Sequence, residues 1–286
     1  MKIHGGDLTK IAELQNCRIA GRKGRIAELQ KGVRKLSSGT SPAPPFSSLF
    51  LPSFLPSFPS CNPAILQSCN RMILVVIPGI VLAAGLSVRM GRPKPNLPIG
   101  SAGDTFLTHL VKTLLEAGVD DVVIVVGHEQ ESVMRSFAAR GVPARFVQNA
   151  DYASGQLSSL LAGMSVVDRP GVTAMLVSLV DVPFVSAGTV RAVVDRYHQT
   201  RARIVRPTRG AEHGHPLLID RSLFDLLRQS DPHLGAKPVV RAHATPQGDV
   251  ELDDEGAFFD IDTPEDYTRA LQIFQPLSAQ RGEHEA

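Results

Sequence analysis

The stretch of sequence that decides the fold runs from residue 73 to residue 94 and reads ILVVIPGIVLAAGLSVRMGRPK. Its first half, residues 73–83, is an apolar run rich in β-branched side chains, which predicts a strand buried on both faces of a sheet. Its second half is rich in small and basic residues and predicts a turn from strand to helix. In open α/β sheets ligands bind beyond the carboxyl ends of the strands, so this turn is the first candidate site.

The same alternation of apolar runs and helical periodicity continues along the rest of the chain. Further strands are predicted at 122–126, 144–147, 174–179, 204–207 and 216–219. Helices are predicted at 104–117, 129–139, 156–167, 186–199, 221–229 and 263–273. Strands that alternate with helices are typical of a mostly parallel sheet with helices on both faces, so we predict an α/β, Rossmann-like sandwich.

Charge divides the chain near residue 72. Residues 1–71 contain ten Lys and Arg against three Asp and Glu, whereas residues 72–286 contain 20 against 25, and the whole chain has a net charge of +2. The larger part is therefore mildly acidic, which argues against non-specific binding of nucleic acid. Basic and aromatic residues are not interleaved in it, and the chain has no Trp. We expect no nucleic-acid partner.

The first 71 residues do not have the pattern of a domain. Seven prolines lie between Pro42 and Pro63, and they favour extended or polyproline conformation over a continuous helix. The first ten residues lack the apolar core of a secretory signal. We interpret residues 1–71 as a disordered extension or as sequence upstream of a start at or near Met72. One domain over 72–275 and a flexible tail over 276–286 would follow.

Cysteine use and hydropathy bear on the compartment. The three cysteines Cys17, Cys61 and Cys69 all precede residue 72, so the predicted domain has neither disulfides nor thiolate chemistry. This pattern fits a reducing compartment, and we expect the protein in the cytoplasm. No apolar run reaches the roughly 18 residues that span a bilayer, so no membrane partner is expected.

The turn after the first strand has the chemistry of a phosphate site. Residues 83–85 are small enough to let a ligand approach the backbone. Gly85 and Gly91 permit positive φ angles, at which successive N–H groups can point at an anion. Arg89 and Lys94 add positive charge and donors that suit phosphate oxygens. The spacing matches neither a P-loop nor a dinucleotide-binding GxGxxG motif.

The string from Leu82 to Lys94 resembles the signature LAAGxSxRMGxxK of the nucleotidyltransferases related to the molybdenum cofactor enzymes. Members of that family join an NTP to a phosphorylated acceptor and release pyrophosphate. The resemblance extends over about 74–272 and implies a nucleotidyltransferase sandwich of GT-A-like architecture. It implies that residues 83–85 line the base and that polar residues after them handle the triphosphate. The implied nucleotide-binding residues are Leu82, Ala83, Ala84, Gly85, Ser87, Arg89, Met90, Gly91, Lys94, Gly155, Ser158 and Ser159.

A second signal is the strand end at 178–184, which reads SLVDVPF. The apolar strand ends in Asp181 and Pro183 interrupts further pairing, so a carboxylate lies at the carboxyl end of the strand. Nucleotidyl transfer needs a hard cation to bridge phosphate oxygens, and a carboxylate completed by water suits Mg²⁺. The stretch also resembles the family's metal-binding Asp-x-Pro. We therefore expect Asp181 to bind Mg²⁺.

The third signal, at 260–267, reads DIDTPEDY and is first of all a helix start. Either Asp262 or Thr263 caps the helix, Pro264 opens its first turn, and the acidic residues after it favour the helix dipole. The stretch also resembles the closing Asp-Ile-Asp-Thr-Pro-Glu-Asp of the family, which implies a second metal contact. We expect Asp262 to make that contact.

Two weaker signals follow. The stretch 155–160 resembles the family's glycine-then-serine-leucine helix start near the nucleotide, although ordinary capping explains it equally well. His213 and His215 lie two apart, but no Cys or third His is near them, so zinc is not favoured. The acceptor-binding residues implied by resemblance to the cytidylyltransferases that complete molybdopterin are Gly214, His215 and Pro216. The family's next motif departs here, because Lys237 replaces Arg and the preceding Gly-Asp is missing, so the acceptor stays open.

Together these motifs predict an enzyme, a Mg²⁺-dependent nucleotidyltransferase similar to molybdenum cofactor cytidylyltransferase, with Arg89, Lys94 and Asp181 as catalytic residues. Guanylyl members of the family read Leu-Ala-Gly-Gly, so Ala84 favours CTP, although one methyl group biases a pocket by only about 1–3 kcal/mol. One alternative is another NTP with a sugar 1-phosphate, a phospholactate-like compound or another small phosphate as acceptor. The other is a non-catalytic nucleotide sensor or a delivery module in transient contact with a molybdoenzyme.

Overall fold

The computed structural model describes residues 76–100 and 103–281, so the extension expected over 1–71 lies outside the described residues. Within the described part, the main sheet has eight strands in the order β10-β7-β9-β6-β1-β4-β5, and β8 pairs with β7. A hairpin of β2 (Pro98–Ile99) and β3 (Asp104–Thr105) forms a separate two-stranded sheet. The strands of the main sheet are β1 Gly79–Leu82, β4 Val122–Val126, β5 Arg145–Gln148, β6 Ala174–Leu179, β7 Ile204–Arg209, β8 Glu212–His213, β9 Leu217–Asp220 and β10 Asp249–Glu251.

Strand pairing in the main sheet is mostly parallel. β1 lies at the centre and pairs in parallel with β4 and β6, while β5 extends the sheet beyond β4 and β10 pairs in parallel with β7. β9 runs antiparallel to β6 and to β7. Parallel strands place their carboxyl ends at one edge of the sheet, so the loops after β1, β4 and β6 are brought together there.

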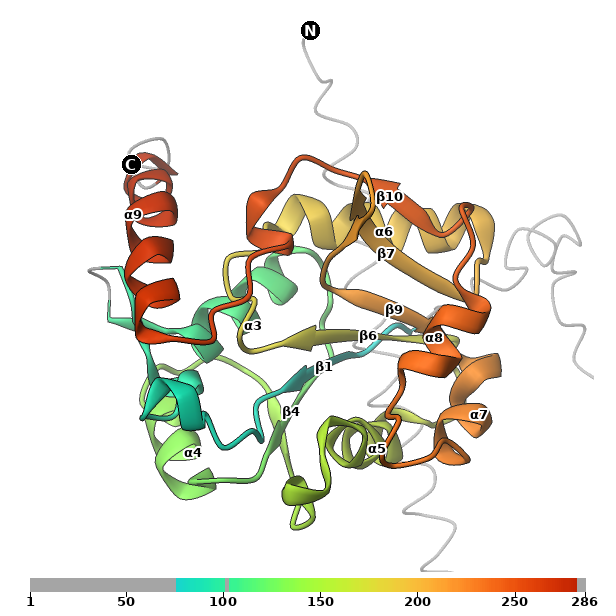
Figure 1. The fold of residues 1–286 in the computed structure, drawn as a ribbon, viewed down its shortest axis with the longest axis horizontal. Helices are drawn as coiled ribbons and strands as arrows, with labels where there is room; N and C mark the ends of the chain where they lie inside the picture. Colours follow the sequence, from blue (N-terminus) through green and yellow to red (C-terminus); the bar gives the residue numbers. More distant parts are fainter. Residues whose placement is uncertain (1–75, 101–102, 282–286) are drawn as a thin grey trace, which may run out of the picture. The chain divides into compact units, whose positions relative to one another are not determined.

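Helices cover both faces of the sheet (Figure 1). One core cluster contains side chains of α3 and α6, and the other contains side chains of α5 and α7, so the sheet separates two apolar layers. The helices are α3 Phe106–Glu116, α4 Gln130–Ala138, α5 Gln156–Val167, α6 Ala187–Thr200, α7 Phe224–Arg228, α8 Lys237–His243 and α9 Pro264–Arg281. The predicted Rossmann-like nucleotidyltransferase sandwich is confirmed.

The first strand is shorter than predicted. β1 begins at Gly79 rather than at residue 73, because Pro78 has no N–H to donate to a neighbouring strand. The carbonyl oxygen of Pro78 still accepts from the amide of Leu176, and Val76 forms an isolated bridge with Val172. Residues 73–75 of the predicted strand lie outside the described residues. The carboxyl end of β1, which bears on the site, agrees with the prediction to within one residue.

Other boundaries differ where side chains cap a helix or a loop intervenes. α3 begins at Phe106, because Thr105 and Thr108 form a reciprocal capping box. The helix predicted at 221–229 is divided into a 3-10 turn at Arg221–Leu223 and α7. α9 runs to Arg281, past the helix end predicted at 273 and into the predicted tail, whose last residues lie outside the described part. The domain limits therefore stay a prediction.

Among the described residues, no helix combines the length and the hydropathy needed to cross a membrane.

Candidate functional site

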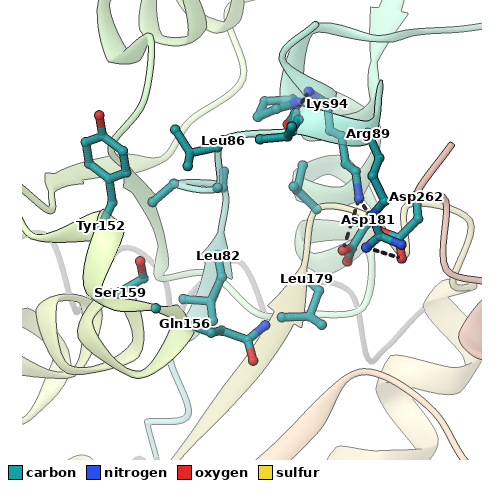
Figure 2. Close-up of a pocket in the computed structure, with 18 of the residues that line it drawn as sticks. Leu82, Leu86, Arg89, Lys94, Tyr152, Gln156, Ser159, Leu179, Asp181 and Asp262 are labelled. Atoms are coloured by element: carbon teal, nitrogen blue, oxygen red, sulfur yellow. Dashed lines mark hydrogen bonds and ion pairs between the residues drawn. The ribbon is translucent and has the colours of Figure 1, made fainter. Parts of the chain in front are cut away.

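A cavity of about 450 Å³ lies beyond the carboxyl ends of β1 and β6. The loop after β1 forms one wall, the segment that leads into α5 forms another, and the ends of β6 and of the segment before α9 close the cavity (Figure 2). Its lining residues are Leu82, Ala83, Ala84, Gly85, Leu86, Ser87, Val88, Arg89, Lys94, Pro95, Tyr152, Ala153, Gly155, Gln156, Ser159, Leu179, Val180, Asp181 and Asp262.

Two cations and two carboxylates meet at one end of this cavity (Figure 2). The Nζ atom of Lys94 lies 2.6 Å from Oδ1 of Asp262 and 3.5 Å from Oδ2 of Asp181. An Nη2 atom of Arg89 lies 2.8 Å from Oδ2 of Asp262. The four side chains come from three segments that are far apart in the sequence, and the fold assembles them at the carboxyl edge of the sheet.

The backbone of the loop after β1 explains how Lys94 reaches this place. Ser87 has a positive φ of 51°, and Gly91 closes the following 3-10 turn with a φ of 71°. The amide of Lys94 donates to Oγ of Ser87 at 3.1 Å, which ties the two ends of the loop together. Gly85, unlike Gly91, does not have a positive φ angle. A Cβ at Gly85 would meet nothing within 4 Å. Its missing side chain leaves space in the cavity instead.

The carboxylate of Asp262 is available to the site because Thr263 and Asp266 cap the start of α9. Oγ1 of Thr263 accepts from the amide of Asp266, and Oδ2 of Asp266 accepts from the amide of Thr263. This reciprocal pair is the capping box at the start of α9. Of the two caps that the sequence allowed, Thr263 is therefore the one that forms, and the carboxylate of Asp262 is left to contact Lys94 and Arg89.

The charges at this end influence one another. The hydrogen bond from Lys94 lowers the pKa of Asp262 below its usual value, and the charges of Lys94 and Arg89 add to that effect. Burial raises the pKa of the nearby Asp260, and the like charges of Asp181 and Asp262 raise it further. The cluster is thus a set of carboxylates whose negative charge attracts cations.

The opposite end of the cavity is less charged. Tyr152 packs over Gly127 at the end of β4, where a Cβ would come within 2.7 Å of the tyrosine, and it lines the cavity with Gln156 (Figure 2). The buried Asn149 donates to Oγ of Ser158 at 2.9 Å and to Oγ of Ser159 at 3.0 Å. Within the described part of the chain the hydroxyl of Ser159 only accepts, so its proton is available to a ligand.

The hydroxyl proton of Ser158, unlike that of Ser159, is not available to a ligand. Oγ of Ser158 lies 2.8 Å from the carbonyl oxygens of Asp151 and Gly155, so its proton is used within the protein. Ser158 does not line the cavity, whereas Ser159 and Gly155 do. Ser158 thus ties the segment before α5 to the first turn of the helix, and α5, whose N-cap is Gly155, has no side-chain cap. Sequence analysis did not identify Tyr152 or Gln156, because no local pattern marks them.

A second cavity of about 480 Å³ adjoins the first. The two share Leu82, Gly155 and Leu179 among other residues, so ligands in the two cavities would lie against the same side chains. Its walls are mostly apolar, and its polar side chains are Ser154, Gln156, His215, His233 and Lys237. Burial lowers the pKa of His215, so the imidazole is neutral near pH 7.

The remaining predicted residues do not reach either cavity. Met90 is 5% exposed and belongs to the apolar core. Gly91 closes the 3-10 turn described above. Gly214 is required by packing, since a Cβ there would lie 2.5 Å from the carbonyl oxygen of Ala257. Pro216 follows a cis peptide bond and is absent from the lining of both cavities, so of the three acceptor residues predicted only His215 lines one.

Comparisons with known proteins agree with this arrangement. The model of the MobA-like NTP transferase domain matches residues 79–247. A nicotine blue oxidoreductase from Paenarthrobacter nicotinovorans is 32% identical over 205 residues, which is 69% of this chain and 98% of that protein.

Two solved structures are also similar to this chain. Rv0371c from Mycobacterium tuberculosis is 27% identical, with a TM-score of 0.58 over 69% of this chain and 98% of that chain. Rv0371c has also been solved in complex with manganese. A nucleotidyl transfer enzyme from Methanothermobacter is 25% identical, with a TM-score of 0.60 over 71% of this chain and 99% of that chain. The chain therefore belongs to the family of MobA-like NTP transferase domains.

Proposed function

We propose that this protein is a nucleotidyltransferase that moves a nucleoside monophosphate from an NTP to a phosphorylated small molecule and releases pyrophosphate. We favour CTP as the donor and molybdopterin cofactor as the acceptor. The observation that carries the proposal is the meeting of Arg89, Lys94, Asp181 and Asp262 at one end of the cavity beyond β1 and β6. Membership of the NTP transferase family supports an enzyme of this class.

The residues at this end fit a divalent cation. Oδ1 of Asp181 is buried and has no hydrogen-bond partner in the described part of the chain, so it is free to coordinate. No group of three or more His, Cys, Asp or Glu suited to a metal occurs among the described residues. Two carboxylates completed by water and substrate phosphate are what Mg²⁺ prefers. Mg²⁺ bound by Asp181 and Asp262 would act as a Lewis acid toward phosphate oxygens.

The implied reaction is an in-line displacement at the α-phosphorus. An oxygen of the acceptor phosphate forms the new O–P bond, and the bond to the β-phosphate breaks as pyrophosphate leaves. The acceptor phosphate is already anionic, so no strong base is needed. Arg89 and Lys94 would neutralise the triphosphate and the charge that develops on the leaving pyrophosphate. The contribution of the protein is thus positioning and charge neutralisation.

The two ends of the site suggest where each substrate lies. The triphosphate would lie against Arg89 and Lys94, and the base would lie against residues 83–85, Tyr152 and Ser159. The acceptor would occupy the adjoining cavity, whose apolar walls suit a ring system and whose Lys237 suits a phosphate. In the cell we expect a cytoplasmic enzyme that contacts a molybdoenzyme transiently.

A second candidate follows from one comparison. The relative from Paenarthrobacter nicotinovorans is named an oxidoreductase and matches this chain over 98% of its length. If this chain shared that type of activity, the cavity would hold a redox cofactor rather than an NTP. The loop after β1 lacks the GxGxxG spacing of dinucleotide sites, which favours nucleotidyl transfer.

The test of the proposal is pyrophosphate release by the purified full chain with Mg²⁺, molybdopterin cofactor and each of CTP, GTP, UTP and ATP. We expect release with CTP and a cytidylyl adduct of the acceptor in the mass spectrum. Release with another NTP, or only with a sugar phosphate, would change the substrates and keep the reaction. Binding of NAD(P)H with no NTP binding would favour the oxidoreductase. NTP binding without turnover on any acceptor would favour a sensor or delivery module.

A further inference from the structure

The ammonium group of Lys94 lies between the two carboxylates proposed to bind the metal. Its Nζ atom is 2.6 Å from Oδ1 of Asp262 and 3.5 Å from Oδ2 of Asp181. The side chain of Lys94 is only 11% exposed, whereas those of Asp181 and Asp262 are 29% and 32% exposed. The lysine is therefore the most enclosed member of the cluster, and it contacts one oxygen of each carboxylate proposed to hold the metal, while Oδ1 of Asp181 has no partner among the described residues.

An ammonium group and a metal ion compete for the negative charge of the same two carboxylates. The pairing with Lys94 is charge-assisted and partly shielded from water, so its removal costs free energy. Arg89 contacts the other oxygen of Asp262, but its side chain is 70% exposed and its contact is weakened by solvent. Lys94 is thus the cation that any metal has to displace.

The backbone of Lys94 is held in place at the wall of the cavity. Its amide is held by Oγ of Ser87, and residues 94–96 form a short 3-10 turn, so the Cα position is set. Its side chain lines the cavity in which the triphosphate would lie. A triphosphate carries more negative charge than the two carboxylates, so it offers the ammonium group a stronger partner within reach.

We propose that Lys94 is an internal counter-ion that makes metal binding depend on the nucleotide. The triphosphate draws the ammonium group away from Asp181 and Asp262, and the two carboxylates then become available to the metal. The nucleotide half of this inference rests on the proposed function, whereas the competition between Lys94 and a metal does not. Because linkage is reciprocal, the metal strengthens nucleotide binding by the same factor.

A purely structural ion pair would behave differently. If Lys94 only stabilised the fold, its replacement would lower the free energy of unfolding and leave the metal affinity unchanged or weaker. If it is a counter-ion that competes with the metal, its replacement tightens metal binding in the absence of nucleotide. Metal affinity without nucleotide therefore separates the two roles.

The experiment measures Mn²⁺ affinity of the nucleotide-free full chain by electron paramagnetic resonance of free Mn²⁺. We expect Lys94→Met to bind Mn²⁺ roughly fivefold or more tightly than the wild type, in the usual range of coupling between sites. Lys112→Met is the matched control, since Nζ of Lys112 contacts both oxygens of Asp104 at 2.8 Å outside the site. Its Mn²⁺ affinity should equal that of the wild type. Equal or weaker binding by Lys94→Met would overturn the proposal.

A second measurement needs no variant and covers the case in which Lys94→Met fails to fold. Mn²⁺ affinity of the wild type is compared with and without the non-transferable analogue α,β-methylene-CTP, after correction for Mn²⁺ bound by the analogue alone. We expect a gain of at least roughly fivefold in the presence of the analogue. An unchanged affinity with the analogue bound would overturn the coupling. Failure of the wild type to bind any NTP would instead overturn the proposed function and leave the Lys94→Met comparison valid.

Discussion

The polar groups of Asp262 and Ser159 are available to the cavity because neighbouring residues make the local hydrogen bonds. Asp262 contacts Lys94 and Arg89 because Thr263 and Asp266 satisfy the start of α9 between themselves. Ser159 keeps a proton for a ligand because Asn149 donates to it. In both cases the determining contacts come from residues that do not themselves line the cavity.

Removal of the Asp181 carboxylate tests the metal assignment. Asp181→Ala should lower turnover at least about 100-fold, because metal-assisted charge stabilisation is worth several kcal/mol and each roughly 1.4 kcal/mol is a factor of ten in rate. The fold should persist, as measured by circular dichroism and thermal unfolding. Asp120→Ala, which changes an exposed aspartate, is the control. Full activity of Asp181→Ala would refute the assignment.

His215 predicts a pH dependence of stability. Burial lowers its pKa in the folded protein below the usual value of about 6.5, so the unfolded chain binds more protons than the folded one below that pH. The contribution of neutral His215 to the free energy of unfolding is fully present above about pH 6.5. It is lost as the pH falls toward the lowered pKa. Denaturant midpoints at pH 7.5 and 5.5 should therefore differ less for His215→Asn than for the wild type. The exposed His198→Asn should keep the wild-type difference, and an equally steep loss in both variants would argue against this role of His215.

The sequence motifs contain the charged residues that meet at one end of the cavity, and they do not mark Tyr152 and Gln156 at the other end. Residues 82–94 form one continuous motif, and Asp181 and Asp262 each follow a recognisable local pattern. Tyr152 and Gln156 line the cavity only because β4 and β1 are neighbours, which is a property of the tertiary structure. Met90, a residue inside the predicted motif, belongs to the apolar core and does not line the cavity.

Helix α5 packs closely on the sheet through a glycine. Gly163 faces the sheet, and a Cβ there would lie 2.7 Å from Cγ2 of Ile80 and 2.9 Å from Cγ2 of Val125. This close approach lets α5 pack on β1 and β4, and the first turn of α5 carries Gln156 and Ser159 into the cavity. The helix that forms the base end of the site is thus located by a glycine.

Two helical glycines give a matched test of this packing. Gly163→Ala should lower the free energy of unfolding by about 1–3 kcal/mol, since overpacking outweighs the gain in helix propensity. Gly188→Ala in α6 should change it by less than about 1 kcal/mol, because a Cβ there meets only Oγ of Ser186 at 3.5 Å. Chemical denaturation measures both. A Gly163→Ala protein as stable as Gly188→Ala would contradict the account of α5.

Long, strongly patterned elements were predicted well, and short ones were not. The strand at 122–126 and the helix at 156–167 have the predicted bounds. Strands β8 and β10 have two and three residues and are defined by their pairing with β7. α8 begins with Lys237 and Pro238 in a region read as part of an acceptor motif. Such elements depend on tertiary contacts more than on local periodicity.

The sheet divides the molecule into two apolar layers that are built from one continuous part of the chain. Within the described residues, both core clusters consist of residues from Ile77 onward. The mostly parallel order of the strands brings the ends of β1, β4 and β6 to one edge, and both cavities lie there. The fold class was predictable because continuous apolar strands alternate with helices, whereas the antiparallel position of β9 was not encoded in any local pattern.

The division of the chain near residue 72 predicts the behaviour of a shortened protein. A chain that begins at Met72 should unfold cooperatively, with a free energy of unfolding within about 0.5–1 kcal/mol of the full chain, because it keeps both core clusters of the described residues. It should also keep the NTP affinity of the full chain. Calorimetry and nucleotide titration check the two expectations. Loss of cooperative unfolding would show that residues 1–71 belong to the domain.

The most direct measurement is a crystal structure of the protein with Mn²⁺ and α,β-methylene-CTP, with anomalous diffraction to locate the metal. We expect an anomalous peak between Asp181 and Asp262, the triphosphate against Arg89 and a displaced Lys94, and the cytosine beside Tyr152 and Ser159. A triphosphate in the adjoining cavity, or a metal that touches neither carboxylate, would contradict the central claim that the end of the cavity where these charged residues meet is the nucleotidyl-transfer site.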